Sequence, residues 1–234
     1  MQSDLFQEMS TTEKHKKGAT SIIHTEERSF IKENEKSLGF IALGIIVLVL
    51  LYFGYQKFYL APRAEKANNE VFKAETYAQI DSLQKLAIKG DGSYPGFEQI
   101  ADEYSNTPSA NIANAYLGGL YLRQGQYQEA VNALENYNST GSPILDPLVI
   151  GLLGDAYSEL KDYKQAATQY KKAANLKSND FTSPLFLKKL GLVNEAQNDY
   201  KGALDAYKKI KSDFPQSFEA SMVDAYIARA EAHL

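Results

Sequence analysis

Three stretches of the chain repeat one pattern: YLGGLYLRQGQYQEAVNAL at 116–134, LLGDAYSELKDYKQAATQYKKA at 152–173 and KLGLVNEAQNDYKGALDAYKKI at 189–210. Each stretch has a Leu-Gly pair, a Tyr nine residues after that glycine, an Ala three residues later and a large apolar residue four residues later again. The glycines Gly118, Gly154 and Gly191 are 36 and then 37 residues apart. A pattern that recurs at this period predicts stacked helical hairpins, because one hairpin alone cannot bury its apolar face.

The small residues of the pattern are expected where the two helices of a hairpin touch, because a missing side chain lets backbones approach closely. These residues are the three glycines together with Ala130, Ala166 and Ala203. The aromatic residues of the pattern are expected to fill the space between successive hairpins.

The pattern resembles the tetratricopeptide repeat, which reads Leu-Gly, Tyr, Gly-x-Tyr, Ala, an aromatic residue, Ala and a closing Pro. Gly125, Ala173 and Pro215 each match one further family position in a single copy. The family period is about 34 residues, so two or three extra residues are expected in each inter-repeat turn. The resemblance covers 109–216 and implies an all-α helical solenoid of three repeats.

The flanking segments are expected to complete the solenoid. A degenerate first repeat is predicted at 91–108, with its second helix at 97–104 and Pro108 closing it. A lone helix at 217–234 is predicted to cap the third repeat, since the end of a stack must be covered. Residues 57–90 are predicted to form a helical stalk, because apolar residues recur at helical spacing up to the turn-rich stretch 90–95.

A separate feature is the uncharged run LGFIALGIIVLVLLYFGY at 38–55. As a helix it would be about 27 Å long, close to the ~30 Å hydrocarbon core of a bilayer. A cleaved signal peptide would need a short basic leader, whereas 37 residues precede this run. We therefore predict a transmembrane helix at 37–56 in contact with the lipid bilayer, preceded by a partly disordered tail at 1–36. Flanking Lys and Arg residues do not decide the orientation.

The composition of the 234 residues excludes several kinds of chemistry. There is no Cys, and the His residues (His15, His24 and His233) all lie near the termini, so disulfides, thiolate metal sites and central imidazoles are absent. No phosphate-binding glycine loop occurs, and a net charge of -4 disfavours nucleic acid. We expect no catalytic residue, cofactor or metal site. A hydrolase using Asp155 and Glu159, which share a helix face, is the alternative from another functional class; a solvated groove edge is favoured.

The first helix of each repeat is expected to line a concave face that binds an extended or helical polypeptide. The alternative is that several of its leucines pack into neighbouring repeats. Counting from the repeated positions places on this face Ile112, Tyr116, Gly119, Leu122, Arg123, Leu148, Leu152, Asp155, Ser158, Glu159, Leu185, Lys188, Lys189, Leu192 and Glu195.

The layout of the whole chain resembles the bacterial ancillary subunits of the Sec translocon. The resemblance lies in TEERSFIKENEKSLGF at 25–40 and FEQIADEYSNTPSANIANAYLG at 97–118. It implies a single-pass protein of the bacterial inner membrane with a cytoplasmic N-terminus and periplasmic repeats. It also implies a non-enzymatic scaffold whose partners are the SecYEG channel and a membrane-anchored periplasmic chaperone of the peptidyl-prolyl isomerase class. A scaffold for envelope assembly or for cell-division coordination is the alternative.

Overall fold

The computed structural model describes residues 34–234, and the predictions for 1–33 lie outside the described residues. The chain divides into two compact units, with the boundary between Ala61 and Pro62. The described residues are helical apart from turns and a single β-bridge between Gly90 and Pro95. The expected all-helical fold class is therefore confirmed for this part of the chain.

The apolar run forms helix α2, Glu35–Tyr55, and none of its residues is buried. A π-helical turn, η1 (Gln56–Leu60), follows it, and the helix continues in sequence to Ala78. The amide of Ala61 donates to the carbonyl of Gln56, the wider bond of a π turn. Pro62 comes next and has no backbone N–H to donate. By length and composition, this helix is a candidate membrane span.

Helix α3 (Ala61–Ala78) belongs to the second compact unit, although a stalk was expected there. Ala67, Val71, Ala74 and Ala78 recur at helical spacing, and all four are buried in a core shared with the following helices. The helical pattern is interrupted at 79–80 and resumes as the 3-10 turn η2 (Asp81–Leu83) and helix α4 (Gln84–Lys89). Residues 62–90 therefore pack with the repeats rather than standing apart from them.

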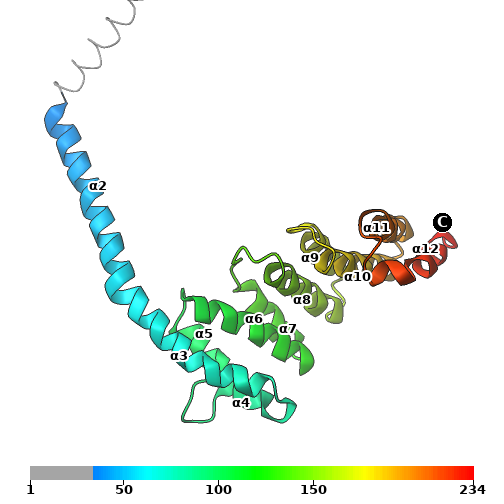
Figure 1. The fold of residues 1–234 in the computed structure, drawn as a ribbon, viewed down its shortest axis with the longest axis horizontal. Coiled ribbons are helices and arrows are strands. Elements are labelled where there is room, and N and C mark those ends of the chain that lie inside the picture. The colour runs from blue at the N-terminus through cyan, green and yellow to red at the C-terminus, as the bar shows by residue number, and fades with distance from the viewer. Residues whose placement is uncertain (1–33) are drawn as a thin grey trace, which may run out of the picture. The chain divides into compact units, whose positions relative to one another are not determined.

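The remaining helices form hairpins that follow one another in chain order, as Figure 1 shows. Within each repeat the two helices pack against each other, and the second helix packs on the first helix of the next repeat. A short 3-10 turn, η3, and a last helix, α12, follow the third hairpin and pack on it. In order these elements are α5 (Phe97–Glu103), α6 (Pro108–Arg123), α7 (Tyr127–Glu135), α8 (Leu145–Glu159), α9 (Tyr163–Asn175), α10 (Thr182–Ala196), α11 (Tyr200–Asp213), η3 (Glu219–Met222) and α12 (Val223–Glu231).

The turn inside each repeat has the same backbone conformation. Gly125, Lys161 and Asn198 occupy equivalent places, and their φ angles are 74°, 61° and 61°. The residue after each of them donates its amide to a carbonyl five residues earlier, at 2.9 Å in all three turns. The glycine of the family pattern thus marks a left-handed backbone position that two copies fill with other residues.

The expected close approach of the helices is confirmed. A Cβ added to Gly118 would lie 2.3 Å from the Leu134 side chain, and one added to Gly191 would lie 2.2 Å from the Tyr207 ring. The large residues of the pattern therefore pack over the glycine of their own hairpin. The sequence pattern predicted instead that the aromatic residues lie between successive hairpins. Tyr170 does both, because it covers Gly154 and also stacks on Phe186 of the next hairpin.

The connection at 136–144 is held by a buried carboxylate. Asp146, at the start of α8, is 1% exposed and accepts hydrogen bonds from the hydroxyls of Tyr137, Ser139 and Thr140 at 2.5–2.9 Å. It also accepts from the amides of Thr140 and Gly141. Burial alone would raise the pKa of Asp146, but these donors outweigh it and hold the pKa well below its usual value. This connection and the one at 176–181 are longer than the turns within the repeats.

Candidate functional site

One open cavity of about 590 Å³ is lined mainly by α6 and α8, with single residues from α7, α9 and α10. We call it the α6–α8 groove. Eight of the residues predicted from the sequence line it, and the structure adds Tyr127 and Tyr170 to them. The predicted residues that it brings together are Gly119, Leu122, Arg123, Leu152, Asp155, Ser158, Glu159 and Lys189.

The groove contains a half-buried polar junction between three helices. Lys189 of α10 donates to both carboxylate oxygens of Asp155 of α8, at 2.6 and 2.7 Å. The hydroxyl of Tyr170 of α9 donates to the same carboxylate at 2.7 Å. Burial, reinforced by the charge of Asp155, raises the pKa of Tyr170, so this hydroxyl stays protonated. The junction therefore fixes the relative positions of the second and third repeats at the groove.

The rim of the groove carries charges of both signs. Arg123 and Glu159 are exposed at the ends of α6 and α8. The charge of Glu159 raises the pKa of Tyr127, which stands beside it. Leu122 and Leu152 line the same cavity, and both are half-buried. The groove thus combines an apolar floor with separated charges, which suits a polypeptide rather than a single small charged ligand.

The groove is also lined by a glycine, Gly119. A Cβ built on Gly119 would meet no atom within 4 Å. Its neighbour Gly118 faces into the hairpin, toward Leu134. Gly119 therefore leaves open space at the groove surface, where a bound chain could approach α6 closely.

The groove does not extend over the third repeat as predicted, because the C-terminal segment lies there. Lys188 is 3.7 Å from Glu219 of η3, and Glu195 is paired with Arg229 of α12 at 2.7 Å. Leu185 and Leu148 pack against the buried core that α9, α10, α11 and α12 form. Leu192 is 40% exposed but lies outside the cavity. The sequence pattern treated α10 as an open face, whereas η3 and α12 use its charged residues to dock.

The two predicted residues nearest the start of α6 also lie outside the groove. Tyr116 stacks on Phe97 of α5, with ring centroids 4.8 Å apart. Ile112 is half-buried and does not line the cavity. The two added tyrosines were missed because their repeat positions indicate packing. The pairing of Tyr170 with Asp155 depends on which helix faces which, and no local pattern carries that information.

The described residues offer no group of three or more His, Asp or Glu side chains that could hold a metal ion. Asp155, one of the two acidic residues considered for catalysis, is engaged by Lys189 and Tyr170. Its carboxylate is therefore held in an ion pair and serves to join helices.

Comparisons with known proteins agree with this architecture. A family model described as tetratricopeptide repeat matches residues 97–137 and 152–218. Residues 97–137 and 152–218 are therefore tetratricopeptide repeats. An all-helical solenoid of such repeats defines the class of protein–protein interaction scaffolds. A crystal structure of kinesin light chain repeats from Podospora anserina, described as nearly identical tetratricopeptide-like repeats, is similar in fold with a TM-score of 0.54. The identity is 16%, over 73% of this chain and 87% of that one. No curated protein matches the sequence.

Proposed function

We propose that this protein is a membrane-anchored scaffold that holds a polypeptide in the α6–α8 groove, as an ancillary subunit of a bacterial Sec translocon. The observation that carries the proposal is the groove itself, which is open, lies across successive repeats and displays both apolar and charged groups. An extended polypeptide offers the same mixture at regular intervals, with its backbone free to run over Gly119.

The proposal includes a membrane anchor. Helix α2 has 21 residues, about 31 Å of helix, which matches the ~30 Å hydrocarbon core. Its apolar side chains are exposed on all sides, an arrangement that suits lipid. In this proposal the N-terminus is cytoplasmic, the repeats are periplasmic, and the partners are SecYEG and a membrane-anchored peptidyl-prolyl isomerase-like chaperone. The resemblance of 25–40 and 97–118 to the translocon subunits supports these details.

The groove can be tested by photo-cross-linking in intact membranes with the full chain. A photoreactive amino acid at Leu122 or Leu152 should capture a secretory polypeptide that is stalled in the channel. The same amino acid at Asp205, an exposed position on α11 outside the groove, is the matched control. Capture at neither groove position, or equal capture at Asp205, would overturn the groove as the binding site. Adducts with cell-wall or outer-membrane assembly proteins in place of the channel would overturn the Sec assignment and favour envelope assembly.

The orientation needs a separate measurement. A reporter enzyme that is active only in the periplasm, fused after Leu234, should be active in cells. An inactive but expressed fusion would show that the repeats face the cytoplasm and would overturn the proposed arrangement.

A further inference from the structure

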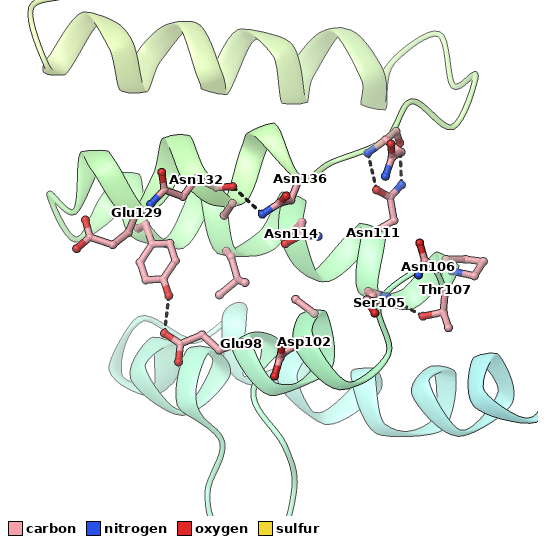
Figure 2. A pocket seen from close by; sticks show the side chains of 17 residues that line it. Glu98, Asp102, Ser105, Asn106, Thr107, Asn111, Asn114, Glu129, Asn132 and Asn136 are labelled. Carbon is pink, nitrogen blue, oxygen red and sulfur yellow. Dashed lines mark hydrogen bonds between the residues drawn. The ribbon is translucent and has the colours of Figure 1, made fainter. Parts of the chain in front are cut away.

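A second and larger cavity, of about 1050 Å³, lies between α5 and α7 and is lined by α6 residues from Pro108 to Tyr121. We call it the α5–α7 pocket. It shares no lining residue with the α6–α8 groove. Figure 2 shows Glu98 and Asp102 on one side of the pocket and Asn132 and Asn136 on the other. The two cavities therefore use α6 and α7 in common but through different residues of these helices, and α5 lines only the pocket.

The lining of this pocket is acidic. Glu98, Asp102 and Glu129 line it, and no Lys or Arg does. Glu98 is already engaged, because it pairs with Lys89 at 2.6 Å and accepts the hydroxyl of Tyr121 at 2.5 Å. Asp102 and Glu129 form no ion pair with any residue in 34–234. Two carboxylates therefore remain available to a positively charged ligand.

The pocket also offers carboxamides with unused hydrogen-bonding capacity. The half-buried side chain of Asn114 has no hydrogen-bond partner among the described residues. The Nδ2 of Asn136 donates a hydrogen bond to the carbonyl of Asn132 at 3.0 Å, and its Oδ1 remains available as an acceptor. The Oδ1 of Asn132 accepts a hydrogen bond from the side-chain amide of Gln128, and its Nδ2 remains available as a donor. Because a carboxamide both donates and accepts, these groups match the alternating N–H and C=O of an extended backbone.

One asparagine of the pocket has a different role. Asn111 donates to the carbonyl of Asn138, at 2.8 Å, and accepts the amide of the same residue at 2.6 Å. Both ends of its carboxamide are therefore occupied, and it fixes the wall where the chain leaves α7. The floor is made of small or buried apolar residues, among them Ala110, Leu117 and Ala133. A firm apolar floor with polar walls is the common construction of a binding pocket.

We propose that the α5–α7 pocket binds an extended, Lys- or Arg-rich segment of a partner protein. Asp102 and Glu129 pair with the cationic side chains, while Asn114 and the paired asparagines of α7 bond the backbone. The charge of the pocket selects the occupant, because an acidic peptide or a nucleic acid would meet unpaired carboxylates. This inference does not depend on the role of the α6–α8 groove.

The test uses the full chain in detergent micelles and a fluorescein-labelled peptide that alternates Lys and Gly. Fluorescence anisotropy should show binding of this peptide and none of its Glu-Gly counterpart. The double variant Asp102→Asn with Glu129→Gln should weaken binding roughly tenfold, since two solvent-accessible ion pairs are removed. Adding Asn114→Ala to the double variant should weaken peptide binding several-fold further. The matched control is Asp180→Asn with Asp205→Asn, which changes the net charge equally at exposed sites outside the pocket.

Four results would overturn the proposal: no binding of the Lys-Gly peptide, an equal loss in the control double variant, unchanged affinity when Asn114→Ala is added, or displacement by spermidine at the same total charge. The last two would show that the pocket attracts cations without recognising a backbone. A photoreactive Lys-Gly peptide, cross-linked to the unaltered protein and mapped by mass spectrometry, needs no variant to fold and should label α5, α6 or α7. Labelling in the α6–α8 groove alone would also overturn the proposal.

Discussion

Gly118 and Gly119 are neighbours in α6, yet an added methyl group should have opposite effects at the two positions. A Cβ on Gly118 would lie 2.3 Å from Cγ and Cδ2 of Leu134, which is 3% exposed. A Cβ on Gly119 would meet no atom within 4 Å. Alanine at Gly118 therefore overpacks the first hairpin, whereas alanine at Gly119 does not.

The size of the difference follows from the geometry. Ordinary carbon contacts are about 3.5–4.0 Å, so Leu134 or α7 would have to move by about 1 Å. Overpacking of this kind costs about 1–3 kcal/mol. Replacing a helical glycine by alanine otherwise stabilises by about 1 kcal/mol. Because both glycines lie in the same helix, this gain cancels in the comparison, and Gly118→Ala should be about 1–3 kcal/mol less stable than Gly119→Ala.

The assay is urea unfolding of the full chain in detergent micelles, followed by circular dichroism at 222 nm. Gly119→Ala should move the midpoint up or leave it unchanged, and Gly118→Ala should move it down. Combining Gly118→Ala with Leu134→Val should recover part of the lost stability, since the smaller valine side chain leaves room for the added Cβ. Midpoints that shift equally for the two alanines would refute the assigned contact between α6 and α7.

Further predictions concern the turns, the core, the buried carboxylate and the cap. Lys161→Gly should stabilise by about 1 kcal/mol in urea unfolding, because Lys161 has a left-handed backbone, with φ of 61°; an unchanged midpoint would contradict this. Ala166→Leu should destabilise by about 1–3 kcal/mol, since Ala166 is fully buried, and a thermal melt without loss would refute the packing. The pKa of Asp146 lies well below its usual value, so its contribution to stability is present above the unfolded pKa of about 4 and is lost as the pH falls below it. Asp146→Asn should therefore cost about 1–3 kcal/mol at pH 7 and less at pH 3, and an equal cost at both pH values would be inconsistent with a charged carboxylate. Deleting 218–234 should expose α10 and α11 and cause aggregation in size-exclusion chromatography; a monomeric and equally stable truncation would contradict the capping role.

The repeat pattern predicted the hairpins well because its signals are local. A Leu-Gly pair and an Ala at fixed spacing specify which face of a helix can be approached closely, and the contacts of Gly118 and Gly191 follow directly. The left-handed turn position also recurs in all three repeats, but only the first repeat has a glycine there, Gly125, that indicates this conformation in the sequence.

The candidate groove was predicted in part. The positions on α6 and α8 came together, because consecutive repeats place equivalent residues side by side. Lys188 and Glu195 of α10 did not remain open, because residues of η3 and α12 pair with them. The α5–α7 pocket was not predicted at all, since its walls come from helices in different repeats and its asparagines follow no repeat spacing.

The sequence by itself determined the hairpins, their order and the apolar helix, because periodicity and hydrophobicity are properties of short segments. Only the tertiary structure decided which faces stay open. It placed α3 in the core, closed the third repeat with η3 and α12, and left acidic and carboxamide groups unpaired between α5 and α7. The physical reason is that the exposure of a side chain depends on what distant segments pack against it.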